Sequence, residues 1–223
     1  MVPRFFYVVL KMRGCLRVRT VFGKAPTLFK AGRYGIGPNT LEEIERQGFE
    51  IDLSLCPCFD YSGDGGPDFR AFDSRPSWFG RSRRLLSLPT TAGRGGLLRG
   101  SWAPITDRLT SAAACRLGID RLATRLDLLH PRRLSPEGNT LAELRRLTRD
   151  LYRGGLRVFT LTLHSPSFTP GKTPYVRCAE DLDRMIAVLD EYLSFFRNEL
   201  DGEFTSPTAV YRRLAALCET RPR

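Results

Sequence analysis

The chain has 223 residues, of which 42% are hydrophobic and 26% charged, and this composition fits one medium-sized globular domain with a buried core. The longest apolar run near the start covers residues 5–10, far short of the roughly 18 residues that a membrane-spanning helix needs, so we expect no membrane span. The formal net charge is +11, but no nucleic-acid-binding signature accompanies it. We therefore interpret the arginine-rich stretch at residues 70–133 as a solvated surface and expect no nucleic-acid partner.

The cysteines and the N-terminal residues indicate the compartment. Six cysteines are scattered along the chain, and the one close pair, Cys56 and Cys58, lacks the spacing of a structural zinc site, so we expect reduced thiols. Basic residues follow the apolar run where a secretory signal would have its cleavage site. We therefore expect a cytoplasmic protein. Residues 1–24 differ from the regular pattern that follows and are interpreted as an atypical N-terminal extension.

Two short strands flank the first predicted helix. Residues 27–30 and 50–55 are typical of strands, and a loop rich in glycine and proline follows the second. The helix is predicted to open near Thr40, because Thr40 and Glu43 have the spacing of a capping box, and Gly48 supplies its stop.

The middle of the chain has one clear strand. Residues 85–89 indicate that strand, and the glycines of residues 90–96 indicate a loop after it. These glycines lack the helix and the lysine of a phosphate-binding loop, so we assign them no anion site. A helix is predicted around residues 106–117, and His130 is expected in a loop.

The last third of the chain contains three predicted helices. Thr140 and Glu143 form a second capping box, which opens a helix that ends at residues 154–155. Residues 157–163 indicate a strand. Apolar residues then recur on one face of a long helix, namely Leu182, Met185, Ile186, Leu189, Tyr192, Leu193 and Phe196. Ser206, followed by a proline, caps a final helix.

Strands that alternate with helices favour an α/β fold with a mainly parallel sheet. In such folds the loops at the carboxyl ends of the strands build the functional site. Pairs of polar residues stand at three of these places, namely Arg33 with Tyr34, Asp60 with Tyr61, and His164 with Ser165. The sequence therefore predicts a site at this edge of the sheet.

His164 is the leading candidate for proton transfer, because the ordinary pKa of histidine, about 6.5, suits acid and base chemistry at neutral pH. Arg33 lies between glycines and is suited to hold a carboxylate through two hydrogen bonds, the alternative being a structural ion pair. Asp60 is a candidate for orienting the histidine, with three rivals: Asp52, Asp64 and Asp68. Although Ser165 adjoins His164, no nucleophile-elbow pattern occurs, so a serine hydrolase is set aside.

Four segments resemble the later half of bacterial polysaccharide deacetylases with a NodB homology domain, of the branch that accompanies polysaccharide assembly. They are FKAGRYGIGPNTLEEIERQGFEID, CFDYSGDGGPDF, LSPEGNTLAEL and FTLTLHSPSFTPGKTPYVR. The resemblance covers about residues 24–210 and implies a partial domain of this family at residues 25–215. The fold that it implies is a distorted (β/α) barrel of the glycoside hydrolase/deacetylase type, incomplete in this chain.

The resemblance implies metal-dependent hydrolysis of N-acetyl groups on a saccharide or polysaccharide intermediate, with zinc as the usual divalent metal. His164 matches the histidine that protonates the departing amine, and Arg33 matches the arginine that positions the catalytic aspartate. Asp60, or else Asp52, matches the acidic residue that tunes the histidine. The implied substrate-binding residues are Tyr34, Tyr61 and Ser165.

The chain departs from the family at the metal ligands. In the family an aspartate and two histidines precede the arginine motif, but residues 1–32 contain neither Asp nor His. Since a metal site needs several converging ligands, we expect a shortened member that lacks these ligands. The alternative is a catalytically inactive saccharide-binding or scaffolding protein.

Overall fold

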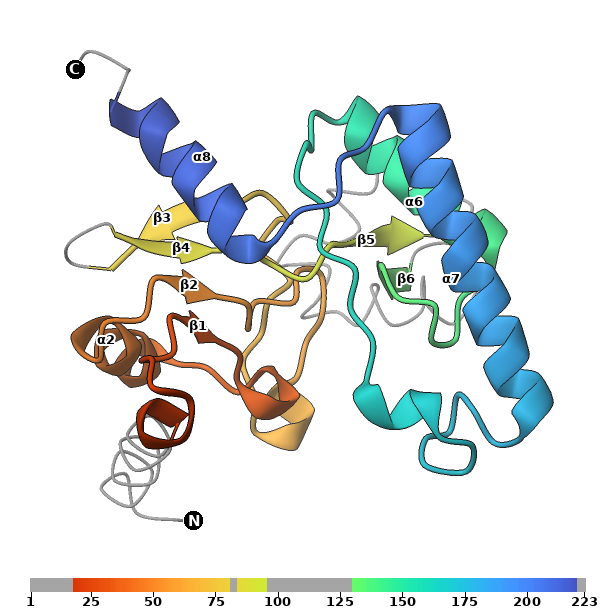
Figure 1. The fold of residues 1–223 in the computed structure, drawn as a ribbon, viewed down its shortest axis with the longest axis horizontal. Helices are drawn as coiled ribbons and strands as arrows, with labels where there is room; N and C mark the ends of the chain where they lie inside the picture. Colours follow the sequence, from red (N-terminus) through yellow and green to blue (C-terminus); the bar gives the residue numbers. More distant parts are fainter. Residues whose placement is uncertain (1–17, 81–83, 96–129, 220–223) are drawn as a thin grey trace, which may run out of the picture.

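In the computed structural model, residues 18–80, 84–95 and 130–219 are described, and they form a mixed α/β fold (Figure 1). The main sheet has the strand order β1-β2-β4-β3. β1 (Leu28–Phe29), β2 (Ile51–Asp52) and β4 (Leu85–Ser87) are parallel, and β3 (Ser77–Phe79) pairs with β4 in the antiparallel direction. The predicted α/β fold is confirmed. Three of the four predicted strands are present as β1, β2 and β4 but shorter than expected, and β3 is an element that the sequence pattern does not indicate.

Apolar side chains bury both faces of this sheet. Ile51 lies beside Leu86 in the parallel register, and both are fully buried with side chains of α8 (Pro207–Glu219) packed against them. On the other face Leu85 packs with Ile44 of α2 (Pro38–Arg46). Figure 1 shows α2 and α8 on opposite sides of the sheet. Such double burial explains why the consecutive residues Leu85 and Leu86 of β4 are both apolar.

A second, two-stranded sheet consists of β5 (Ala92–Gly95) and β6 (His130–Arg133) in antiparallel pairing. The predicted loop at residues 90–96 is therefore wrong for residues 92–95, and the loop predicted around His130 is also wrong. Pairing with a distant segment converts a glycine-rich stretch into a strand, which local sequence patterns do not reveal. Within the described residues the strands form these two sheets and no closed barrel.

The predicted strand at residues 157–163 is not a regular strand. The Thr91 N–H donates to the Thr160 carbonyl at 3.2 Å, and the Thr162 N–H donates to the Leu134 carbonyl at 3.0 Å. Its backbone partners thus come from the ends of two different strands, so no continuous ladder forms. The segment still runs beside the second sheet, and His164 follows it directly in the chain.

The two capping-box predictions have opposite outcomes. At α6 (Leu141–Arg153) the Thr140 N–H donates to Glu143 at 2.7 Å and the Glu143 N–H donates to the Thr140 hydroxyl at 3.4 Å, so this box is confirmed. At α2 the Thr40 N–H instead donates to the Gly37 carbonyl, and no side chain caps the helix. The box predicted there is wrong, because proline at the first helical position starts α2 before Thr40.

The remaining helices agree with the sequence. α7 (Ala179–Leu200) packs on α6 and buries Met185 and Tyr192 of its predicted apolar face, although Ile186 is 44% exposed. α8 begins after Ser206, whose hydroxyl accepts from the Ala209 N–H at 3.2 Å. The helix predicted around residues 106–117 lies outside the described residues.

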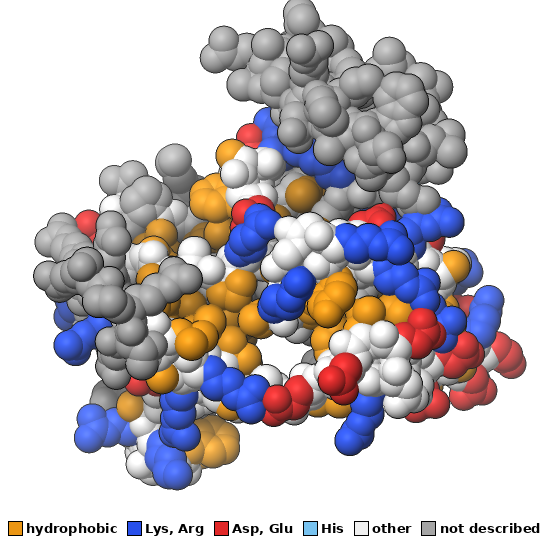
Figure 2. All heavy atoms as spheres, turned by 90° about the horizontal axis from the view of Figure 1, so that it is seen from above, with side chains coloured by type: hydrophobic (Ala, Val, Ile, Leu, Met, Phe, Trp, Pro, Cys, Tyr) orange, Lys and Arg blue, Asp and Glu red, His pale blue; other side chains and the backbone are white. Residues whose placement is uncertain are grey.

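A cavity of about 770 Å³ separates the segment at residues 157–161 from α7 and α8. Its apolar lining includes Leu53, Leu88, Val158, Leu193, Phe196 and Val210. Figure 2 shows hydrophobic side chains bordering an opening near the middle of the molecule. None of the described helices is long and apolar enough to cross a membrane.

Candidate functional site

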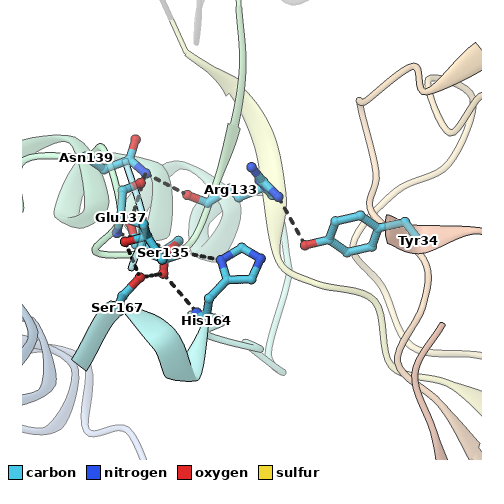
Figure 3. A network of polar contacts seen from close by, with 8 residues as sticks. Tyr34, Arg133, Ser135, Glu137, Asn139, His164 and Ser167 are labelled. Atoms are coloured by element: carbon cyan, nitrogen blue, oxygen red, sulfur yellow. Dashed lines mark hydrogen bonds and ion pairs between the residues drawn. The ribbon is translucent and has the colours of Figure 1, made fainter. Parts of the chain in front are cut away.

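The carboxylate of Glu137 holds His164. One oxygen, Oε1, accepts from the His164 backbone N–H at 2.9 Å, and the other, Oε2, lies 2.8 Å from the imidazole Nδ1. The Ser167 hydroxyl, in the short helix η4 (Ser165–Phe168), also donates to Oε1. Figure 3 shows these three side chains pointing toward one another. Glu137 therefore fixes both the backbone and the ring of His164.

The loop between β6 and α6 positions Glu137. Leu134 is fully buried at the start of this loop, and the Glu137 N–H donates to the Ser135 hydroxyl at 3.2 Å. The Asn139 side-chain amide donates to the Ser135 carbonyl at 2.9 Å, while Thr140 ends the loop as the cap of α6. Each end of the loop is thus tied down, which limits the positions that the carboxylate can adopt.

Burial and hydrogen bonding act in opposite directions on Glu137. Its side chain is 5% exposed, and this desolvation alone would raise the pKa of the carboxyl group. The hydrogen bond from Ser167 and those from the backbone and ring of His164 outweigh it, so the pKa lies below its ordinary value. Glu137 is therefore a carboxylate at neutral pH.

An ionised carboxylate only accepts hydrogen bonds, so the nearby Nδ1 of His164 carries the hydrogen. The imidazole side chain is 59% exposed, which leaves Nε2 as the atom for exchange with a ligand or with water. A carboxylate on one ring nitrogen and solvent at the other is an arrangement suited to general acid or base catalysis.

A second cluster lies on the other side of the imidazole (Figure 3). Arg133 of β6 donates from Nη1 to the Tyr34 hydroxyl at 3.1 Å, and its guanidinium lies 5.0 Å from the centre of the Phe59 ring. The rings of Tyr34 and Tyr61 stack with centres 5.3 Å apart, and Phe59 and Tyr61 stack at 6.0 Å. The ammonium group of Lys30 lies 5.4 Å from the Tyr34 ring centre. We call these five residues the aromatic-basic cluster.

The loops after β1 and β2 bring this cluster together. Tyr34 ends the short helix η1 (Gly32–Tyr34) with a positive φ of 56°, a strained value for a tyrosine. The Tyr61 hydroxyl donates to the sulfur of Cys56 at 3.4 Å, and burial raises the pKa of both groups. The cysteine is thus a buried thiol that supports Tyr61, with little thiolate to act as a nucleophile.

The predicted site residues fall into two groups. His164, Tyr34 and Tyr61 lie in the clusters described above, whereas Ser165 is exposed at the start of η4. Arg33 is exposed, with φ at 50°, and it forms no ion pair among the described residues. Its predicted role in holding an aspartate stays a prediction.

The carboxylate that contacts the imidazole of His164 is that of Glu137, and not that of Asp60 or Asp52. Asp60 lies 3.3 Å from Arg70 and accepts from the Ser62 N–H at 2.9 Å. Asp52 is buried at the end of β2, where it accepts from the Ser54 N–H at 3.2 Å. The sequence reasoning misses Glu137 because this residue stands in a loop before α6, far in sequence from any strand end considered. One available signal is its place in the LSPEGNTLAEL segment.

The described residues do not offer a metal site. No three side chains among their His, Cys, Asp and Glu residues are grouped closely enough to hold an ion. Nδ1 of His164 is engaged by Glu137, and Nε2 of His130 lies close to Arg132. The zinc that the family resemblance implies therefore has no fitting ligand set in this part of the chain.

Comparison of the chain with models of protein families, with curated proteins and with solved structures gives no match.

Proposed function

We propose that the chain is a polysaccharide deacetylase-like protein that binds an N-acetylated saccharide beside His164 and uses this histidine in hydrolysis of the N-acetyl group. The observation that carries the proposal is the contact between Glu137 and His164. It supports a histidine whose free nitrogen can donate a proton to a departing amine, the role that the sequence resemblance implies.

The aromatic-basic cluster supports the choice of a saccharide. Tyr34, Tyr61 and Phe59 are half-buried rings in near-parallel stacks, with interplanar angles of 18° and 12°. Aromatic faces pack on the apolar C–H faces of sugar rings, and the polar groups at their edges can bind hydroxyl groups. Figure 3 shows Tyr34 and Arg133 of this cluster on the side of the imidazole away from Glu137, so a sugar bound here would lie near His164.

The proposed fold is an open part of a distorted (β/α) barrel. The strands β1, β2 and β4 are parallel, and the loops after β1 and β2 supply the four residues Lys30, Tyr34, Phe59 and Tyr61 of the aromatic-basic cluster. This arrangement resembles the carboxyl-terminal face on which barrel enzymes place their active sites. The proposal also retains the cytoplasmic location expected from the sequence, and fractionation of cells that express the chain tests it.

Because the described residues contain no fitting ligand set, we assign no step of the hydrolysis to a metal. The chemistry that this chain's own residues supply is narrower. Glu137 orients the imidazole through Nδ1, and Nε2 of His164 holds or releases the proton.

The deciding experiment measures acetate release from N-acetylchitotetraose by the full chain, with and without added zinc. We expect release that falls at least about a hundredfold in His164→Asn and less in Glu137→Gln, since general acid catalysis contributes factors of this size. Glu199→Gln is a matched control, because Glu199 lies on α7 and forms a solvent-exposed ion pair with Arg149 of α6. Release that His164→Asn leaves unchanged would refute the proposed role of the histidine.

A second candidate function is saccharide binding without hydrolysis. The observation that favours it is the combination of the aromatic-basic cluster with the lack of a metal-ligand group in the described part of the chain. Saccharide binding measured by calorimetry, with no acetate released under any metal condition, would select this candidate over the enzyme.

A further inference from the structure

Lys30 and Arg133 place two cations against the same tyrosine ring. The Lys30 ammonium lies 5.4 Å and the Arg133 guanidinium 5.8 Å from the centre of the Tyr34 ring. Neither cation forms an ion pair with a carboxylate among the described residues. The neighbouring Arg132 is different, since it lies 2.8 Å from Glu143 and donates to Asn139 at 2.6 Å.

The charge of Arg133 acts on Lys30, and each of the two cations is partly removed from water. Desolvation lowers the pKa of Lys30, and Arg133 lowers it further, although Cys56 and the buried Asp52 act in the opposite direction. Asp52 thus offsets part of the charge on Lys30, but no carboxylate among the described residues pairs directly with either cation, so a ligand that carries a carboxylate would be stabilised by both side chains.

We propose that the saccharide bound beside His164 is an acidic one, whose carboxylate is held between Lys30 and Arg133 while its ring packs on the aromatic side chains. This inference rests on the proposed function and names the substrate class. A guanidinium is planar and matches the two oxygens of a carboxylate. Among the described residues, the guanidinium of Arg133 donates one hydrogen bond, from Nη1 to the Tyr34 hydroxyl.

The two parts of the proposed site are close in the chain. Arg133 and Glu137 are separated by four residue steps, which span at most about 14 Å even when fully extended. A short oligosaccharide that places a carboxylate at Arg133 can therefore reach His164 with a neighbouring sugar unit.

The test compares the binding of two tetrasaccharides to the full chain by calorimetry. One is a hyaluronan fragment, in which glucuronate alternates with N-acetylglucosamine, and the other is neutral N-acetylchitotetraose. We expect the acidic fragment to bind about tenfold more tightly, and Arg133→Gln to remove this preference. Arg153→Gln is the charge-matched control, because the Arg153 side chain is 76% exposed on α6 and distant in sequence from the cluster.

The possible outcomes separate the two proposals. Equal affinity for both fragments overturns the acidic specificity and leaves saccharide binding standing, whereas no binding of either overturns both. Inorganic phosphate that competes as well as glucuronate would show a general anion site and overturn the assignment of a carboxylate.

If Arg133→Gln unfolds, as circular dichroism would reveal, Lys30→Met serves as the second variant with Lys172→Met as its control. Retention of the full preference in Lys30→Met would then refute the inference.

Discussion

Glu137 accepts two hydrogen bonds from one residue, the backbone N–H of His164 at 2.9 Å and the imidazole Nδ1 at 2.8 Å. The same carboxylate also accepts from Ser167, so it joins the loop before α6 to both ends of the turn after residue 163. A change at Glu137 should therefore alter the stability of this region as well as the state of the imidazole.

Glu137→Gln is expected to lower the free energy of unfolding by about 1–3 kcal/mol at neutral pH, because a buried charge-assisted acceptor is lost. The pKa of Glu137 is lower in the folded chain than the ordinary 4.5, so its stabilising contribution is present above that value. It disappears as pH falls through the lower folded pKa. Urea midpoints at pH 7 and in a series down to pH 3 should show the two chains converging in acid. A constant difference at every pH would contradict the assignment.

Thr140→Ala is expected to destabilise the first turn of α6 by about 1 kcal/mol, because it removes the capping hydroxyl. Thr40→Ala provides an internal control of the same chemistry, since Thr40 lies inside the first turn of α2 and caps nothing. Amide hydrogen exchange of the two helix starts measures both effects. Equal increases in exchange at the two sites would contradict the difference between them.

These two threonines illustrate how far the sequence predicts the fold. Thr40 and Thr140 are each followed three residues later by a glutamate, and the local pattern is the same. Only Pro38 distinguishes the first site, because it starts the helix earlier. Helices with an apolar face and strands with buried runs are predicted well, because their signals lie within one segment.

The parts that the sequence does not predict depend on distant partners. β5 becomes a strand by pairing with β6, some 40 residues later in the chain, and residues 157–163 lose a regular ladder because they bond to two different segments. The partner of His164 is likewise distant in sequence, since Glu137 lies 27 residues before it. The four candidate aspartates and Glu137 are chemically equivalent in the sequence, and only packing of the β6–α6 loop selects the glutamate.

Tyr192→Phe tests the contact between α6 and α7. The Tyr192 hydroxyl lies 2.9 Å from the buried Thr148 hydroxyl, and its loss should cost about 1 kcal/mol of stability. Burial raises the pKa of Tyr192 to about 12 from the ordinary 10.0. Because the folded state favours the neutral phenol, its contribution is complete below pH 10 and is lost as pH rises through 12. The stability advantage of the parent chain over Tyr192→Phe should therefore shrink above pH 10 and be lost in strong alkali, and an advantage that persists there would refute this account.

The cavity of about 770 Å³ between α7, α8 and residues 157–161 should bind an apolar dye in the native state. Val210 projects from α8 into this lining, and Val210→Phe should narrow the cavity and reduce the fluorescence of bound 8-anilinonaphthalene-1-sulfonate. Ala216→Phe is the matched control, since Ala216 is exposed on the same helix and does not line the cavity. Circular dichroism must show equal helix content in all three chains. Dye fluorescence that falls equally in both variants, or that is absent from the parent chain, would mean that the cavity is closed in solution.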